Sequence, residues 1–243
     1  RGLVHQTPGV FFGPPRGLFG EFMTATLGAS VPVEEISRQE AEARFPLLRF
    51  EAGDSVMLDH TAGVLAASEA MLGLREWLAD HDVEVRSGVT GRRLTSAGDS
   101  VRIETDDEVL CAAAVVVATG AWLPELLPDW PQAIATLRQQ VGFVEVVADK
   151  HLTQTGTFPV WCRIGEAADD FVYGLPEFGQ PGLKLAHHRT TGVADDPNEA
   201  PGSIDRMALA DLARARLSAP VAAVLSAESC LYAVTPGEEL RVA

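Results

Sequence analysis

The chain has 243 residues, 47% of them hydrophobic, and it carries a formal charge of −15 from 34 acidic and 19 basic residues. This apolar content is sufficient for a core in one large domain or two small ones. The acidic balance argues against nucleic acid or an anionic membrane surface as the main partner, because both bind clustered lysine and arginine.

The cysteines, Cys111, Cys162 and Cys230, lie far apart and form no CxxC pair, so the sequence predicts neither a metal site nor a secreted disulfide framework. No apolar run approaches the roughly 20 residues that a membrane-spanning helix needs. The first residues also lack the apolar stretch of a signal peptide. We therefore expect a cytoplasmic protein.

Short elements are expected in the first part of the chain. Residues 10–13 predict a strand, and residues 20–27 predict a short helix. The capping-box spacing of Ser37 and Glu40 predicts a further helix, which Pro46 ends.

The clearest predicted helix covers residues 66–80, where apolar residues recur at helical spacing. Short strands are expected after it at 83–85, 87–89, 92–95 and 101–105. Polar and apolar residues alternate in the last of these, which indicates a half-buried antiparallel ribbon.

The run from Ala112 to Ala118 has no polar side chain and ends at Thr119 and Gly120. Such a run predicts the central strand of a parallel sheet that is covered on both faces. Ligands bind outside the carboxyl ends of these strands, so Gly120 and Trp122 are expected to face a site. A buried strand followed by an ordinary turn is an equally good alternative from the strand alone.

The character of the chain changes near residue 135, where a mostly antiparallel sheet is expected to begin. Strands are predicted at 137–144, 160–163, 171–174 and 183–187, with Gly- and Pro-rich loops between them. Ser203 can cap a helix that precedes a last strand at 231–234.

Lys184 stands between Leu183 and Leu185 in one of these strands. A lysine that faces a dry interior is costly unless it is paired, and such lysines often serve chemistry. A lysine on an exposed strand face is the alternative, and from the pattern alone it is the better supported one. The neighbouring His187 and His188 point to opposite faces, and no third ligand argues for a metal.

Two other groups of residues have side chains that often occur in catalytic or binding sites. Cys230 and Tyr232 share one strand face, although a lone cysteine is usually a small buried hydrophobe. The donors at 138–140, Arg-Gln-Gln, enter a strand, and ordinary strand-edge polarity would explain them equally. The sequence contains no Ser/His/Asp triad, paired-carboxylate site or GxGxxG fingerprint.

Eight stretches nevertheless occur in the order and with the spacing of the amino-acid oxidase family of flavoproteins. The sequence most resembles the monomeric sarcosine oxidase and N-methyltryptophan oxidase branch of that family. The stretches are Val10–Pro14, Ser37–Pro46, Gly63–Leu65, Val116–Trp122, Arg138–Phe143, Tyr173–Pro176, Gly182–Lys184 with His188, and Cys230–Tyr232 with Thr235 and Pro236.

The resemblance implies a mixed α+β and α/β fold. A substrate domain with a mostly antiparallel mixed sheet and helices would be joined to a partial, Rossmann-like FAD-binding domain. Residues 1–62 and 135–235 would form the substrate domain, and residues 63–134 the partial FAD-binding domain. Residues 236–243 would begin a further segment of the FAD-binding domain.

The resemblance also implies roles for individual residues. Cys230 matches the cysteine that is joined covalently to FAD, and Lys184 matches the lysine that assists electron transfer to O2. Tyr173 and His188 match residues of the substrate pocket, while Val89 and the run Gly120, Ala121 and Trp122 match the segment that runs beside the adenosine and pyrophosphate of FAD. The implied reaction removes a hydride from the carbon beside a secondary amine, such as an N-methyl amino acid like sarcosine, and O2 is then reduced to H2O2.

The sequence departs from the family at both ends. The strand–GxGxxG–helix unit that opens the family's chains and their closing Gly-rich segment have no counterpart here. Gly237 stands where an acidic residue is common, and His187 replaces a more usual aromatic residue. We therefore expect a truncated member that binds FAD weakly or not at all as given, with an apolar face that favours self-association.

Other functions remain open from the sequence. The chain could be a catalytically inactive substrate-domain fragment that acts as a binding or oligomerisation module. A flavin dehydrogenase or a glycerol-3-phosphate-type oxidase of the same superfamily is a further alternative, against which Lys184 favours an amine oxidase. The particular amine is not predicted, because the arginines that usually bind the substrate carboxylate would precede this sequence.

Overall fold

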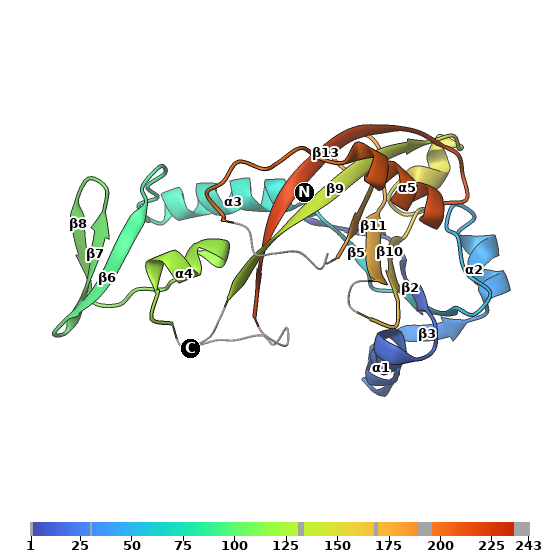
Figure 1. The fold of residues 1–243 in the computed structure, drawn as a ribbon, viewed down its shortest axis with the longest axis horizontal. Coiled ribbons are helices and arrows are strands. Elements are labelled where there is room, and N and C mark those ends of the chain that lie inside the picture. Colours follow the sequence, from blue (N-terminus) through green and yellow to red (C-terminus); the bar gives the residue numbers. More distant parts are fainter. Residues whose placement is uncertain (1, 30, 131–133, 168–169, 189–195, 236–243) are drawn as a thin grey trace. The chain divides into compact units, whose positions relative to one another are not determined.

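The computed structural model describes residues 2–29, 31–130, 134–167, 170–188 and 196–235 (Figure 1). The chain divides into two compact units. The first unit comprises Arg1–Ala70, Gln139–Thr191 and Pro201–Cys230, and the second comprises Met71–Arg138, Gly192–Ala200 and Leu231–Ala243. The two units are described separately below.

An eight-stranded mixed sheet forms most of the first unit. Its strands are, in spatial order, β13 (Val221–Val234), β9 (Ala135–Val146), β12 (Leu183–His187), β11 (Phe171–Leu175), β10 (Val160–Ile164), β2 (Gly9–Gly13), β4 (Ser55–Asp59) and β3 (Val33–Ile36). β10 and β2 pair in parallel, whereas β9–β12, β12–β11, β11–β10, β2–β4 and β4–β3 pair antiparallel. The mixed fold class with a mostly antiparallel sheet is therefore confirmed.

One face of this sheet carries the largest hydrophobic core. Strand residues such as Phe12, Trp161 and Leu185 point to this face and are at most 1% exposed. Helices α2 (Arg38–Arg44) and α5 (Arg206–Arg216) bury their apolar residues in the same core. We call it the core face.

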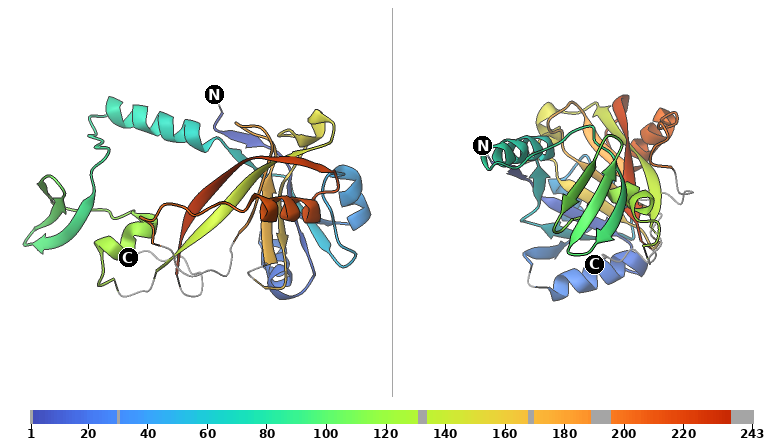
Figure 2. Two further views of the ribbon diagram at one scale, coloured as in Figure 1. Left: turned by 45° about the horizontal axis from the view of Figure 1, so that its top comes forward. Right: turned by 90° about the vertical axis from the view of Figure 1, so that its left-hand side faces the viewer.

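The opposite face is covered only in part by a helix. Phe19 and Met23 of α1 (Gly17–Gly28) pack against Met57 and Ile164 from two strands of the sheet. A separate small cluster of Val141, Phe143 and Ala186 lies on β9 and β12. Figure 2 shows the sheet with α1 and α5 from two further directions.

The helix signals of the first unit are largely confirmed. The hydroxyl of Ser37 accepts a hydrogen bond from the backbone N–H of Glu40, 3.2 Å away, and α2 ends before Pro46 as expected. The cap of α5 is different from the prediction: the Asp205 carboxylate, and not Ser203, accepts the N–H of Ala208 at 2.9 Å. Aspartate is as good an N-cap as serine, so the helix begins at the residue that follows it.

The predicted strands of the sheet are also confirmed at β2, β9, β10, β11 and β12. The last strand is longer than predicted, because β13 has 14 residues and begins at Val221. Two further strands, β1 (Val4–Gln6) and β5 (Gly63–Leu65), form a separate antiparallel pair.

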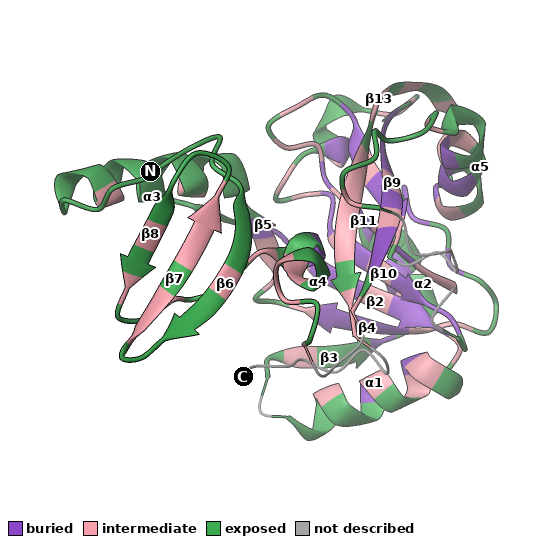
Figure 3. Ribbon diagram, turned by 60° about the vertical axis from the view of Figure 1, so that its left-hand side comes forward, coloured by how far each residue is buried: buried purple, intermediate pink, exposed green. Residues whose placement is uncertain are grey.

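The second unit contains few buried residues. Helix α3 (Ala67–Asp80) matches its prediction but buries none of its residues, as the green ribbon in Figure 3 shows. Strands β6 (Gly91–Ala97), β7 (Ser100–Thr105) and β8 (Val109–Ala112) form a three-stranded antiparallel sheet, as the alternation predicted. The predicted strands at 83–85 and 87–89 are wrong, since these residues are irregular.

The predicted buried strand at 112–118 is also wrong. β8 ends at Ala112, residues 113–119 have no regular structure, and Val116 is 92% exposed. A continuous apolar run becomes a buried strand only where neighbouring strands supply hydrogen bonds. Among the described residues, no strand pairs with this segment beyond Ala112.

The assignment of segments 1–62 and 135–235 to a substrate domain, and of 63–134 to an FAD-binding domain, stays a prediction. Segment 236–243, with Gly237, lies outside the described residues. Within the part of the chain that the structure describes, no helix has the length and apolar character needed to cross a membrane. The expected cytoplasmic location also stays a prediction.

Candidate functional site

Strand pairing in the first unit brings predicted site residues to one face of the sheet. Lys184 on β12 lies directly opposite Phe143 on β9, and Tyr173 on β11 lies directly opposite Ala186 on β12. Directly opposed residues of paired strands share a face, and residues two apart along a strand do so as well. Tyr173 and Lys184 therefore point away from the core face, on the side of the small apolar cluster.

Cys230 reaches the same cluster from β13. Its half-buried side chain packs against the cluster of Val141, Phe143 and Ala186, as does Tyr173. The Lys184 ammonium lies over the Phe143 ring, with Nζ 6.0 Å from the ring centroid. The amine and the thiol thus flank one apolar cluster.

His188 joins this group just beyond the end of β12. Its ring centroid is 4.5 Å from that of Phe171 and 6.5 Å from that of Tyr173, and its backbone N–H donates to the Phe171 carbonyl oxygen at 2.7 Å. We call the cluster of Val141, Phe143 and Ala186, together with Phe171, Tyr173, Lys184, His188 and Cys230, the candidate face.

Phe171 was not among the predicted site residues. It lies two residues before Tyr173 on β11 and therefore on the same side of the strand. The two-residue period of the predicted strand could have placed Phe171 on the same face as Tyr173. Its ring contact with His188 depends on the pairing of β11 with β12, which the sequence alone did not specify.

His187 points to the core face, which confirms that the two neighbouring histidines face opposite sides. It lies opposite Val172, and its buried Nδ1 has no hydrogen-bond partner among the described residues. Burial, and then the nearby Arg216 guanidinium, lower the pKa of His187, while Asp170 opposes them. The ring is therefore neutral near pH 7.

The lowered pKa of His187 predicts a loss of stability in acid. Between the folded-state pKa and the ordinary value of about 6.5, the unfolded chain binds more protons than the folded chain. The free energy of unfolding should therefore be unaffected above this window and should fall as the pH falls below about 6.5. The slope stays under the single-proton limit of about 1.4 kcal/mol per pH unit, because the folded and unfolded states differ by less than one bound proton at this site.

Urea unfolding of the wild type and of His187→Gln at pH 7.5, 6.5 and 5.5 measures this effect. The free energy of unfolding of the wild type should fall more between pH 7.5 and pH 5.5 than that of His187→Gln. A difference that is constant over this range would contradict the assignment.

The predicted residues of the second unit form a different local arrangement. Gly120, with a φ of +54°, begins a short 3-10 helix, η1 (Gly120–Trp122), which leads into α4 (Leu123–Leu126). Trp122 Nε1 donates to Asn198 Oδ1 at 3.0 Å, and Ala121 is buried. Val89 is 42% exposed in an irregular segment.

The polar run at 138–140 makes hydrogen bonds to the segment before α5. In the second unit, Arg138 donates to the carbonyl oxygens of Asp196 and Glu199 at 3.2 and 3.0 Å. In the first unit, the Gln140 side-chain oxygen accepts the backbone N–H of Asp205 at 2.9 Å. Because these hydrogen bonds go to backbone groups, they favour a structural role for residues 138–140 over a role in a site.

Two pockets of the structure lie away from the candidate face. One cavity of about 420 Å³ is lined by residues that include Thr7, Arg44 and His60, and another of about 400 Å³ is lined by residues that include Asp54 and Arg163. Neither is lined by the predicted site residues. Among the described residues, no group of three His, Cys, Asp or Glu side chains is placed to hold a metal ion.

Solved structures with a similar fold include an amino acid oxidase and a glycine oxidase. The open form of NikD, described as an unusual amino acid oxidase, matches with a TM-score of 0.76 at 19% identity over 96% of this chain and 62% of its own. Glycine oxidase from Geobacillus kaustophilus matches with a TM-score of 0.72 at 16% identity over 98% of this chain and 61% of its own. At these identities the likeness shows the fold alone.

In sequence, the chain is similar to sarcosine oxidases. Monomeric sarcosine oxidase from Bacillus sp. (strain B-0618) is 29% identical over 202 residues, which are 81% of this chain and 50% of the relative. Human peroxisomal sarcosine oxidase is 27% identical over 213 residues, which are 84% of this chain and 54% of the relative. The chain therefore spans about half the length of these two relatives.

The family model "FAD dependent oxidoreductase" matches residues 6–242. The chain belongs to this family.

Proposed function

We propose that this chain provides the substrate-binding side and one flavin-contacting side of an FAD-dependent amine oxidase. The substrate would be a small secondary amine such as the N-methyl amino acid sarcosine, with O2 as the electron acceptor and H2O2 as a product. The observation that carries this proposal is the position of the Lys184 amine and the Cys230 thiol at the same apolar cluster.

The residues of the candidate face fit a flavin ring. A planar, largely apolar ring system needs apolar surroundings, and the cluster of Val141, Phe143 and Ala186 supplies apolar side chains behind the partly buried Tyr173 and Cys230. The Cys230 thiol at the edge of this cluster is a suitable group for a covalent bond to the ring. FAD, when bound, supplies the acceptor for the hydride that leaves the carbon beside the amine nitrogen.

Lys184 would act through its charge. Its side chain is half-buried, so a positive charge on its ammonium interacts more strongly with a nearby negative charge than it would in water. Negative charge develops on O2 when it accepts electrons, and a fixed cation lowers the free energy of that step. The proposed role of Lys184 is therefore in the reduction of O2 and not in the removal of the hydride.

Tyr173, His188 and Phe171 would hold the amine. Their rings approach one another at the edge of the candidate face, with centroids 4.5 and 6.5 Å apart for the two pairs that involve His188. The face of an aromatic ring attracts a cationic amine. The arrangement supports a small substrate that is bound through its amine end.

Gly120, Ala121, Trp122 and Val89 are proposed to contact the adenosine and pyrophosphate of FAD. The positive φ of Gly120 supports this role, because glycine permits a turn through which backbone N–H groups reach a phosphate. The prediction that the chain as given binds FAD weakly stays part of the proposal.

A second candidate function is a non-catalytic binding or oligomerisation module. The observation that favours it is the exposed apolar surface of α3, where Met71, Leu72, Leu74 and Trp77 are each 48–61% exposed. Such a face favours self-association or a partner. Titration of the chain as given with FAD separates the two functions, since tight stoichiometric binding would refute a role without flavin.

Anaerobic reduction of the bound flavin by substrate tests the proposed function. The protein expressed from its complete gene should be yellow and should lose its flavin absorbance when sarcosine is added without O2. On admission of air, the absorbance should return with formation of H2O2. A flavoprotein that sarcosine and other N-methyl amino acids leave oxidised would contradict the proposed substrate class.

A further inference from the structure

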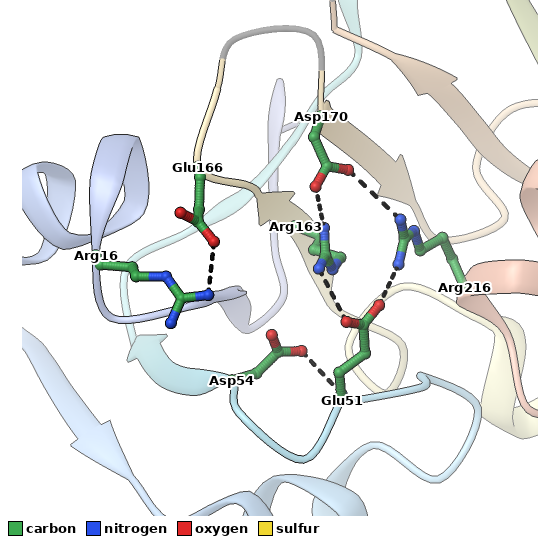
Figure 4. A network of polar contacts seen from close by, with 7 residues as sticks. All are labelled: Arg16, Glu51, Asp54, Arg163, Glu166, Asp170 and Arg216. Carbon is green, nitrogen blue, oxygen red and sulfur yellow. Dashed lines mark hydrogen bonds and ion pairs between the residues drawn. The ribbon is translucent and has the colours of Figure 1, made fainter.

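A network in which two largely buried arginines bind two more exposed carboxylates lies on the core face of the sheet (Figure 4). The side chain of Arg163 on β10 is only 7% exposed, and its two terminal nitrogens bind different carboxylates. Nη1 donates to Asp170 Oδ2 at 2.8 Å, and Nη2 donates to Glu51 Oε2 at 3.1 Å.

Arg216 at the end of α5 binds the same two carboxylates. Its Nη1 donates to Glu51 Oε1 at 3.0 Å, and its Nη2 lies 3.6 Å from Asp170 Oδ1. The two arginines and two carboxylates therefore form a closed ring, which we call the charge network. It ties together the loop at Glu51, the turn between β10 and β11, and the C-terminal end of α5.

The charge network lies next to the two strand ends that carry the Phe171–His188 ring pair. Asp170, one of its carboxylates, immediately precedes Phe171. His187, which lies in the same row of paired residues as Val172 and Arg163, immediately precedes His188. Because successive strand residues point to opposite faces, the network and the ring pair lie on opposite sides of the same two strand ends.

We propose that the charge network positions the Phe171–His188 ring pair on the candidate face. Asp170 and Arg163 act as positioning residues, since they fix the backbone at the start of β11 and thereby the direction of the Phe171 ring. The positioning of the two rings is a property of this chain alone. Its effect on substrate binding rests on the proposed function.

The network restrains this turn more strongly than a surface ion pair would. The Arg163 side chain is only 7% exposed, so the loss of one carboxylate would leave its charge poorly compensated, and we expect the turn to shift when either partner is removed. Glu166 in the same turn offers a comparison. It binds Arg16 with both side chains exposed, at 54% and 72%, and such pairs hold structure weakly.

The position of the His188 ring can be followed by NMR in the chain as given, without flavin. The ring signals of His188 are assigned with His188→Gln, and Phe171→Leu measures how much of their chemical shift comes from the Phe171 ring. Asp170→Asn should lose most of this ring-current shift. Glu166→Gln, the matched control in the same turn, should keep it.

A variant that destabilises the core at another place separates positioning from a general loss of structure. Val56 is fully buried in the core face on β4, distant along the sheet from the ring pair, and Val56→Ala should leave the His188 signals unchanged. Asp170→Glu, which keeps the charge, should restore part of the shift. If Asp170→Asn fails to fold, Glu51→Gln removes the other carboxylate and gives the same readout.

Two outcomes would overturn the proposal. His188 signals that are unchanged in a folded Asp170→Asn or Glu51→Gln protein would show that the network does not position the ring. An equal change in Val56→Ala would show that any destabilisation has this effect. Failure to find flavin or amine oxidation would sink the proposed function and leave this geometric result intact.

Discussion

Replacing Cys230 by serine is expected to abolish acid-stable flavin in the protein expressed from its complete gene. A thiolate is a far better nucleophile than a hydroxyl, so serine at the same place cannot form the bond that sulfur forms. The measurement is the yellow colour and flavin fluorescence that remain with the polypeptide after acid precipitation. We expect essentially none in Cys230→Ser.

The other cysteines are matched controls for this result. Cys162 is also on the candidate-face side of the sheet, since it lies opposite Tyr173, but burial raises the pKa of its thiol to about 12. Cys111 is exposed on β8. Cys162→Ser and Cys111→Ser should keep wild-type amounts of acid-stable flavin, and a Cys230→Ser protein that keeps as much would refute covalent attachment at this residue.

Replacing Lys184 by methionine is expected to slow the reoxidation of the reduced protein by O2 about 10²–10³-fold, the usual cost of removing one preorganised charge-stabilising group. The reduction by substrate should change much less, because the cation interacts with charge on O2 and not with the departing hydride. Stopped-flow absorbance measures both half-reactions separately.

Lys150→Met is the control for Lys184→Met. Lys150 pairs with Glu177 at a surface turn and is the other lysine of the sequence. This variant should reoxidise at the wild-type rate. Equal slowing of both half-reactions in Lys184→Met would instead indicate that this residue supports the structure of the site without a specific role toward O2.

Much of the sheet could be predicted because its local signals agree with its tertiary structure. Short segments between Gly- and Pro-rich loops marked β10, β11 and β12, and the two-residue period of a strand correctly placed His187 and His188 on opposite faces. The capping-box spacing at Ser37 likewise gave the start of α2, because that signal depends only on neighbouring residues.

The sequence misled where a feature depends on distant partners. The apolar run at 112–118 reads as a buried strand, but burial requires strands on both sides, and β8 ends at Ala112 with β7 as its partner. The same dependence hides the charge network: Glu51 and Arg163 are separated by 112 positions in sequence, and neither stands in a motif. Strand order and pairing, which periodicity does not determine, bring these residues together.

The candidate site was predictable to an intermediate degree. Resemblance to a family selected Tyr173, Lys184, His188 and Cys230, whereas residue patterns alone favoured an exposed lysine and an ordinary buried cysteine. The structure adds that these four side chains belong to one face, because β12 pairs with β9 and Cys230 packs against the apolar cluster there. Their chemical roles stay predictions.

Cross-linking of the chain as given tests the central claim most directly. Apart from the amino terminus, its amines are Lys150 and Lys184 and its thiols are Cys111, Cys162 and Cys230, so each linked peptide pair can be identified by mass spectrometry. A short amine-to-thiol reagent should join Lys184 to Cys230 as the main internal product. Absence of this link, or a link from Cys230 to Lys150 in its place, would contradict a shared face and with it the proposed flavin site.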